Sequence, residues 1–157
     1  MYRTIEDFKA DWTHNAAGTM NVIQAISDEK MDQAIVEGHS SLGWLAWHLA
    51  TAPMFFGNAL AGLNLNVQVD PQAQPATVAE IAKVYEEVSN ELLAKVSQLD
   101  DADLLAEVKG INGPTPRGFI LRAMIDHQTH HRGQMTVLLR QAGLRVPPVM
   151  GPTQEMK

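Results

Sequence analysis

The sequence predicts an all-α protein built as a four-helix bundle. Four long segments place apolar residues at spacings of three and four, the pattern of one buried helix face, and little of the chain alternates as a strand does. No repeat, low-complexity run or second domain is visible. Amphipathic helices of this length bury their apolar faces most simply against one another, so we expect residues 1–157 to form a single helical bundle domain.

The first helix is predicted from an apolar face that recurs from Phe8 to Ile26. Two polar residues, Asn15 and Thr19, interrupt this face near its middle. Both are therefore candidates to open from the first helix toward a site between the helices.

The second helix is predicted to begin at Ser40 or Ser41, either of which suits an N-cap, and to continue through residues 42–60. Its inner stripe is expected to hold Leu45, His48, Ala52, Phe55 and Ala59. Pro53 lies inside this helix. We expect a kink there, because proline cannot bond back to residue 49.

The third helix is predicted to start at Thr77, with Glu80 three residues later in a capping-box pattern. Its apolar stripe is continuous: Val78, Ile81, Tyr85, Val88, Leu92, Val96 and Leu99. Residues 100–113 are expected to hold one helical turn and some extended chain.

The fourth helix is predicted to open with Thr115 as its N-cap and Pro116 at the first helical position. It should run to Ala142, where Gly143 is a natural C-terminal residue. The tail that follows is too rich in proline and glycine to be helical.

Composition and charge exclude several classes of function. The formal net charge is -6 and the 12 Lys and Arg are scattered singly, so the basic surface that nucleic acid requires is missing. No segment approaches the roughly 20 apolar residues of a membrane span, and the acidic N-terminal stretch is not a signal peptide. We therefore expect a cytoplasmic protein with neither nucleic-acid nor membrane partners. The chain has no cysteine, so a transition-metal site must use histidine and carboxylate.

Three histidines lie close together in residues 125–135, IDHQTHHRGQM. His127 and His131 are four residues apart on the stripe that should face the core, and a Cβ separation of roughly 5–6 Å suits two imidazoles on one ion. His130 lies about 100° round the helix from His131 and is expected to be peripheral. The alternative is a pair of buried neutral histidines, but burying two without a shared partner costs several kcal/mol.

His48 is a third histidine on an inward stripe, near the middle of the second helix. Metal sites in bundles are built from side chains that face inward on different helices at similar depth. Three neutral nitrogens leave one coordination position open, as catalytic zinc sites do. We therefore predict that His48, His127 and His131 bind one metal ion.

Further polar residues are candidates for the pocket around this site. Gln134 is placed to line it or to orient a water on the metal, and Tyr85 to reach it from the third helix; helix packing is the alternative for both. No Cys, Ser or Lys stands beside a base as a nucleophile. The catalytic residues therefore stay unknown, and any catalysis falls to the metal.

Other neighbours of the histidines have simpler interpretations. Arg132 is expected at the surface or in an interhelical ion pair. Asp126 is four residues from Arg122, which favours a surface pair, with a carboxylate partner to a ligand histidine as the alternative. Trp44, one turn before His48, is a candidate wall of the site.

Three stretches carry a resemblance to a known family: LGWLAWHLA at residues 42–50, DHQTHHRGQM at 126–135 and the tail VPPVMGP at 146–152. Together they resemble the DinB family, also called the YfiT-like metalloenzymes, over nearly the whole chain. The resemblance implies a four-helix bundle with a long crossover between the second and third helices. Its metal triad matches His48, His127 and His131. Met150 stands where relatives often have an aromatic residue.

The resemblance also implies a divalent transition metal, zinc or nickel, and a thiol-dependent activity such as S-transfer from a low-molecular-weight thiol. Homodimers are implied as well, for which Trp47 or Phe56, expected on the outer side of the second helix, are candidate contacts. The predicted function is a metal-dependent transferase, or a related isomerase or hydrolase, acting on a small molecule. The alternatives are a non-catalytic metal- or ligand-binding bundle and a structural bundle whose histidines bind nothing.

Overall fold

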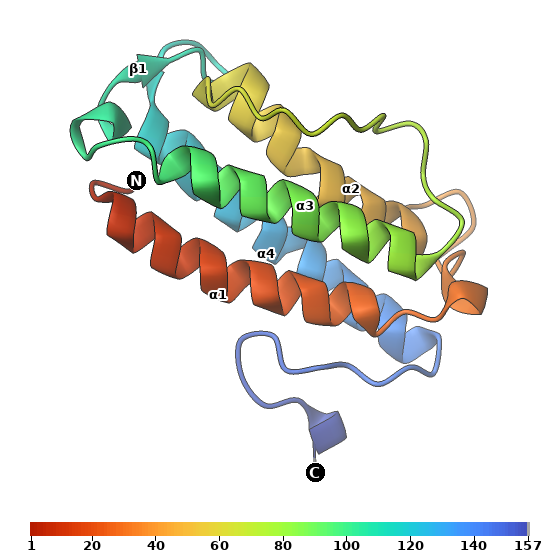
Figure 1. The fold of residues 1–157 in the computed structure, drawn as a ribbon. Coiled ribbons are helices and arrows are strands. Elements are labelled where there is room, and N and C mark those ends of the chain that lie inside the picture. The colour runs from red at the N-terminus through yellow and green to blue at the C-terminus, as the bar shows by residue number, and fades with distance from the viewer. Residues whose placement is uncertain (157) are drawn as a thin grey trace.

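Four helices form most of the molecule in the computed structural model, which describes residues 1–156 (Figure 1). They are α1 Ile5–Gln24, α2 Leu42–Met54, α3 Val78–Val96 and α4 Arg117–Gln141. The predicted all-α four-helix bundle is therefore confirmed. No helix among the described residues combines the length and the apolar character that a membrane span needs.

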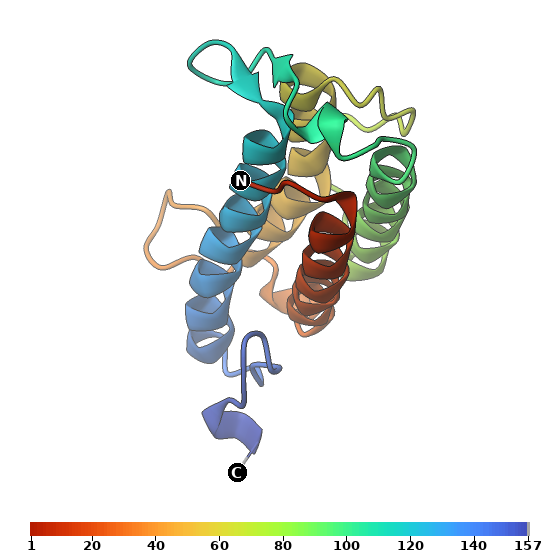
Figure 2. The same ribbon diagram turned by 90° about the vertical axis from the view of Figure 1, so that its left-hand side faces the viewer.

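The helices are arranged so that α1 and α2 each contact both α3 and α4. Their order around the bundle is therefore α1, α3, α2, α4. Figure 1 and Figure 2 both show α2 and α3 running in the same direction, because the segment 62–77 returns along the length of the bundle between them. This confirms the long crossover between the second and third helices.

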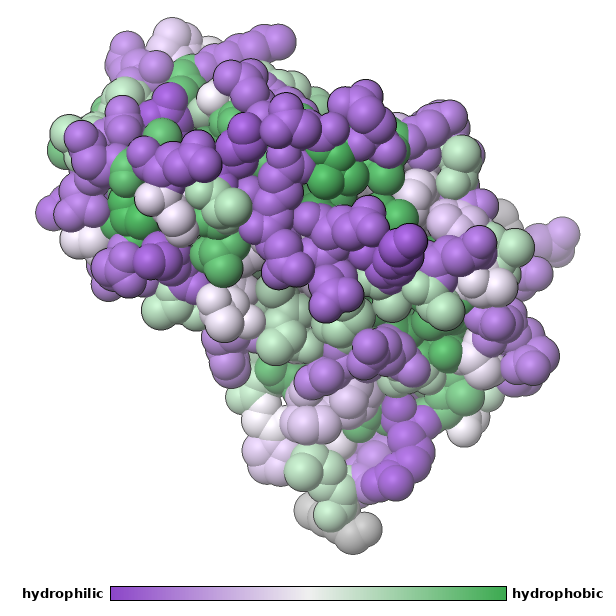
Figure 3. Space-filling view, in the orientation of Figure 1, coloured by the Kyte–Doolittle hydropathy of each residue, from purple (hydrophilic) through white to green (hydrophobic). Residues whose placement is uncertain are grey.

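The crossover is fixed to α3 by one carboxylate. Glu91 accepts hydrogen bonds from the backbone amides of Asn66 and Val67, at 2.6 and 2.8 Å. Farther along, the Pro71 carbonyl accepts from the indole Nε1 of Trp47 at 3.0 Å. The crossover therefore lies along the bundle as an ordered element. Figure 3, in the orientation of Figure 1, shows hydrophilic residues over most of the face of the molecule that is turned toward the viewer.

The start of α2 agrees with the sequence, but its end does not. Ser41 is the N-cap and accepts from the Trp44 amide at 3.2 Å. After Pro53 the chain continues as a wider π-helix, Phe55–Ala61. Each turn of a π-helix holds more residues than an α-turn, so the inward positions fall later than predicted: Phe56 is buried, whereas Phe55 is 57% exposed.

The observed surface of α2 differs from the prediction, through the change of phase after Pro53 and through the crossover that covers Trp47. Phe55 and Ala59 were predicted to face inward, and both are exposed. Trp47 and Phe56 were predicted to face outward, and both are buried. The exposed aromatic residues of this helix are instead Trp44 and Phe55.

The two later helices begin differently from each other. Thr77 caps α3 as predicted, accepting from the Glu80 amide at 3.3 Å. Thr115 does not cap α4 and Pro116 is not its first residue. Both lie in strand β2, Thr115–Pro116, which pairs antiparallel with β1, Glu107–Val108, and α4 starts at Arg117. The strand pairing keeps these two residues extended, and this overrides the capping signal.

The remaining elements are single 3₁₀ turns, at Asp28–Lys30, Ala102–Leu104 and Gln154–Met156. The turn at Ala102–Leu104 and strand β1 confirm the expectation of one helical turn and some extended chain in residues 100–113. Gly143, with φ 75°, follows the end of α4 as predicted.

The core consists of two apolar clusters with a polar layer between them. One cluster contains Phe8, Trp12, Leu92 and Ile125, and the other contains Val22, Leu45, Ile81 and Leu139. Between them, three buried polar side chains cross the bundle: Thr19, Gln128 and Arg132. Thr19 thus interrupts the apolar stripe of α1 because it belongs to this layer.

Candidate metal centre

Three histidines meet where α2 faces α4. His48 comes from α2, and His127 and His131 from successive turns of α4. One donor nitrogen from each ring lies within 4.8 Å of the other two, and the Nε2 atoms of His48 and His127 are 3.0 Å apart. All three side chains are half-buried. The structure therefore brings together the three histidines that the helical spacing selected.

The two helices are joined by a hydrogen bond beside the histidines. Gln128 donates from Nε2 to the carbonyl of Leu49, at 3.2 Å. Pro53 has no amide hydrogen and so cannot donate to this carbonyl as a helical residue four positions later normally does. Gln128 therefore satisfies a buried acceptor that the α2 backbone leaves free.

Gln134 orients one of the three rings. Its Oε1 lies 2.7 Å from Nδ1 of His131. Because an amide oxygen only accepts hydrogen bonds, His131 carries its proton on Nδ1 and presents the Nε2 lone pair to the other histidines. The same amide approaches Nε2 of His130 through its nitrogen, at 3.3 Å. His130 is exposed and is not among the three clustered histidines.

His127 is held by packing instead. Its Nδ1 atom is buried and has no hydrogen-bond partner among residues 1–156. The ring of Phe56 packs against it, with centroids 5.2 Å apart. His48 is also held by an aromatic ring, since Trp44 stacks on it at 4.8 Å with an interplanar angle of 10°. Trp44 therefore is the wall of the site that the sequence suggested.

Burial keeps the three imidazoles neutral near pH 7. Desolvation, together with the positive charges that His131, His48 and His130 acquire on protonation, lowers the pKa of His127 to about 4. Desolvation likewise lowers the pKa of His48 and of His131. Each ring therefore offers an unprotonated nitrogen, the form that binds metal ions.

This donor set fits a divalent transition metal. Tetrahedral sites with metal–nitrogen bonds of about 2.0–2.1 Å place their nitrogens roughly 3.3 Å apart, close to the 3.0 Å between His48 and His127. Only histidines belong to the cluster within the described part of the chain. Three imidazoles leave a position open for a further ligand, as catalytic sites do.

The other two predicted pocket residues lie in the polar layer of the core. Tyr85 donates its hydroxyl to Oε1 of Gln128 at 3.3 Å, and Asn15 accepts from Arg132 Nη2 at 2.6 Å. Neither of them lines the hollows beside the histidines. Of Gln134, Asn15 and Tyr85, only Gln134 contacts a histidine of the cluster.

Arg132 does not occupy the surface or ion-pair position that was expected. It is 2% exposed, and it donates to the backbone carbonyl of Asn15 and to the hydroxyl of Thr129, while forming no ion pair within residues 1–156. Asp126 does form the expected surface pair with Arg122, at 2.8 Å. Arg132 therefore belongs to the buried polar layer, one residue beyond His131.

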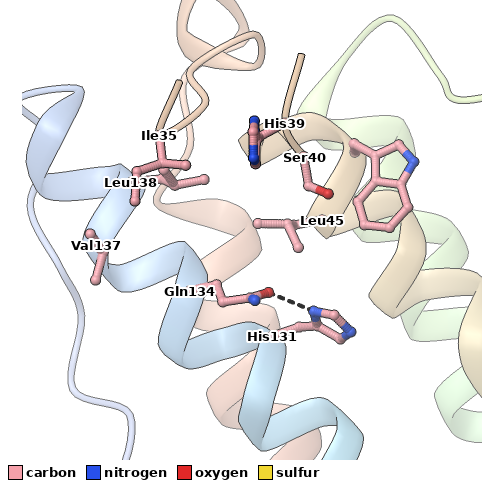
Figure 4. Close-up of a pocket in the computed structure, with 9 residues that line it drawn as sticks. Ile35, His39, Ser40, Leu45, His131, Gln134, Val137 and Leu138 are labelled. Atoms are coloured by element: carbon pink, nitrogen blue, oxygen red, sulfur yellow. Dashed lines mark hydrogen bonds between the residues drawn. The ribbon is translucent and has the colours of Figure 1, made fainter. Parts of the chain in front are cut away.

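A hollow of about 340 Å³ opens next to His131 (Figure 4). Figure 4 shows His131 and Gln134 toward one end of it and Ile35 with Leu138 toward the other. Its apolar lining consists of five side chains: Ile35, Trp44, Leu45, Val137 and Leu138. The loop that carries Ile35 gave no signal in the sequence, because an isolated apolar residue in a polar loop has no periodicity to reveal what it faces.

A second hollow, of about 200 Å³, lies beside His48. Its lining includes Thr51, Gln72 and Gln74, so it is more polar than the first. Trp44 lines both hollows. The three histidines are therefore reached from two sides that differ in chemical character.

Comparison with protein families matches residues 1–157 to the family described as DinB. The chain belongs to the DinB family. The DinB chain is 35% identical to the uncharacterized protein YrdA of Bacillus subtilis strain 168 over 158 residues, covering 99% of this chain and 93% of the relative.

Two solved structures are similar to this DinB chain. A DinB-like protein from Bacillus cereus ATCC 10987 is 37% identical with a TM-score of 0.89, covering 95% of this chain and 99% of the other. The DinB-like protein YjoA from Bacillus subtilis has a TM-score of 0.73 at 19% identity, covering 93% and 99%. At that identity the second likeness concerns the fold alone.

Proposed function

We propose that this protein is a metal-dependent enzyme of the DinB type that uses a low-molecular-weight thiol. The reaction is S-transfer to a small molecule, or a related isomerisation or hydrolysis. The observation that carries the proposal is the cluster of three neutral histidines, each with one donor nitrogen within 4.8 Å of the others. Zinc and nickel are the metals that we propose, because imidazole ligands suit both.

The residues around the cluster have separate roles in this proposal. His48, His127 and His131 hold the ion, Gln134 keeps the Nε2 lone pair of His131 directed inward, and Trp44 keeps His48 in place. A divalent ion held by neutral ligands supplies acidification of a thiol or water at its open position. The chain has no cysteine of its own, so the sulfur must come from a separate thiol molecule.

The experiment uses protein in which cobalt replaces the native metal. We expect a small thiol to produce a sulfur-to-cobalt charge-transfer band that is absent in His127→Ala. A cobalt spectrum that does not respond to any cellular thiol would contradict thiol transfer. A thiol band without consumption of the thiol in the presence of electrophiles would instead support the non-catalytic metal- or ligand-binding alternative.

Location and assembly are parts of the same proposal. We place the enzyme in the cytoplasm, where low-molecular-weight thiols are kept reduced.

We also propose a homodimer, for which the 57% exposed Phe55 on the outer side of the bundle is a suitable apolar contact. Sedimentation of the wild type should show twice the chain mass of 17.2 kDa. Phe55→Ser should shift the observed mass toward that of a single chain. A wild-type monomer at all concentrations would contradict the dimer.

A further inference from the structure

The hollow beside His131 has a lining without formal charge. Among the described residues that form it there is no Asp, Glu, Lys or Arg, and the five apolar side chains are joined by His39, Ser40, His131 and Gln134. A volume of about 340 Å³ is near the lower end for ligand pockets, roughly 300–1,000 Å³. It is thus large enough for a short alkyl chain or one aromatic ring.

His131 and Gln134 place polar groups where this hollow meets the three histidines, and His39 and Ser40 add polar groups from the loop before α2 (Figure 4). His131 and Gln134 are one turn apart on α4, whereas Val137 and Leu138 continue the wall farther along the same helix. Ile35 faces them from the loop before α2 (Figure 4). A ligand whose polar end lies at His131 and Gln134 therefore has its hydrocarbon part among the apolar residues farther along α4 and on the loop.

Trp44 separates this hollow from the more polar one beside His48. It lines both, and its ring stacks on the His48 imidazole. Thr51, Gln72 and Gln74 on the far side offer hydrogen bonds that a hydrophilic molecule needs. The site is therefore asymmetric, with one entrance suited to a hydrocarbon group and the other to a polar one.

We propose that the hollow beside His131 binds the uncharged alkyl or single-ring aryl group of a substrate whose polar end reaches the three histidines. The assignment of this ligand as a substrate rests on the proposed function, whereas binding in the hollow does not. An apolar group transferred from water into such a lining gains affinity by about fourfold for each buried methylene. A charged group at the far end of the chain loses part of its hydration and finds no side chain of opposite formal charge in the lining.

The test titrates the full chain, metal-free and zinc-loaded, with straight-chain primary alcohols from ethanol to hexanol. Methyl NMR signals of Val137 and Leu138 report binding in the hollow. We expect affinity to rise by about fourfold per methylene until the hollow is full. 6-Amino-1-hexanol, which carries a charge at its far end, should bind at least about tenfold more weakly than hexanol.

A pair of double variants provides the control. Ile35→Ser with Val137→Ser removes apolar lining at two exposed positions, 58% and 47% exposed, and should reduce the gain per methylene to less than about twofold. Ile111→Ser with Phe119→Ser makes the same type of change at one loop and one α4 position that are also exposed but lie outside this hollow. This control should keep the wild-type dependence on chain length.

Affinity that is independent of chain length would overturn the proposal, and so would equal losses in both double variants. The outcome is distinct from a failure of the proposed function, because alcohol binding is measured with and without the ion. A protein that binds alcohols as expected but gives no cobalt–thiol band would keep the apolar hollow and lose the thiol chemistry. A normal thiol band with no alcohol binding would keep the thiol chemistry and overturn the apolar hollow as a binding site.

Discussion

The amide of Gln128 donates to the carbonyl of Leu49 at 3.2 Å, the carbonyl that Pro53 leaves without a helical donor. Gln128 and Leu49 are the chain neighbours of His127 and His48. A proline in one helix and a glutamine in another thus act together, because the first frees the acceptor that the second uses. Their hydrogen bond fixes α2 against α4 next to the three clustered histidines.

Replacing Gln128 should destabilise the protein strongly. Gln128→Met leaves three buried partners without their hydrogen bond: the carbonyl of Leu49 and the hydroxyls of Thr19 and Tyr85. Each buried group left unpaired costs about 1–3 kcal/mol, and Thr19 keeps a second acceptor in its own helix. We expect a loss of about 3 kcal/mol in the free energy of unfolding, measured by urea denaturation.

The contribution of Leu49 can be separated from the others by restoring its helical donor. Pro53→Ala provides an amide hydrogen at the position that normally bonds back to residue 49. In the Gln128→Met background, Pro53→Ala should therefore recover about 1 kcal/mol or more. If the two substitutions are simply additive, the carbonyl of Leu49 does not couple them and the interpretation is wrong.

Metal content should depend on three histidines and not on the fourth. Alanine at His48, His127 or His131 removes one of the three clustered donors, and each variant should retain much less zinc than wild type in plasma-emission analysis. His130→Ala should retain most of the metal, because His130 is exposed and outside the cluster. Equal metal content in all four variants would reject the site.

Gln134 should tune the metal affinity without providing a ligand. Its contact with Nδ1 of His131 fixes the tautomer that presents Nε2, and loss of such a partner typically weakens metal binding by about 10- to 100-fold. We expect that effect for Gln134→Leu in a competition titration with a chromophoric chelator. Gln141→Leu, at an exposed position near the end of the same helix, should bind zinc as wild type does.

The metal-free protein should lose stability as the pH falls from about 6.5 to about 4. The pKa of His127 is lowered to about 4 by burial and by its histidine neighbours, while in the unfolded chain it is about 6.5. Between these values the unfolded state binds more protons than the folded state, so the free energy of unfolding decreases with falling pH. Below about pH 4, His127 is protonated in both states and no longer changes the free energy of unfolding with pH.

The control for this pH dependence is a variant that lacks the titrating ring. Urea denaturation of metal-free His127→Phe between pH 4 and pH 7 should show a shallower decrease than wild type. His14→Phe, at an exposed position of α1, should show the wild-type slope. Identical slopes in wild type and His127→Phe would contradict the assigned cause.

The sequence was sufficient to predict the histidine cluster because helical periodicity alone determines which residues share a face. His127 and His131 are one turn apart in any α-helix. His48 lies in the regular part of α2, before the π-helix begins, so its position on the helix follows the ordinary spacing. After Pro53 the prediction for α2 was wrong because the π-helix changes the spacing and exposes Phe55. Before it, Trp47 was also misplaced, because the crossover covers it and its Pro71 carbonyl accepts from the Trp47 indole. Periodicity cannot anticipate a change in the number of residues per turn.

The polar layer was harder to predict, because each of its residues is recognised as buried only once its hydrogen-bond partners on other helices are known. Arg132 is buried against Asn15 and Thr129, which replace the ion pair that a buried arginine usually needs. Gln128 was not selected by any sequence signal, although Pro53 indicated that a carbonyl would lack its donor. Tertiary contacts of this kind depend on which helices are neighbours, which the order of helices along the chain does not specify.

The separation of the three histidines along the chain determines when their cluster can form. His48 and His127 are 79 residues apart in sequence, and α3 lies between them along the chain. During synthesis, His48 is added to the chain long before His127 and His131 on α4. No partly synthesised chain therefore contains the three-histidine cluster. If the cluster binds a metal ion as we propose, the ion binds late and stabilises only the completed bundle. Metal supply in the cell would then influence how much finished protein persists, and not how its early helices form.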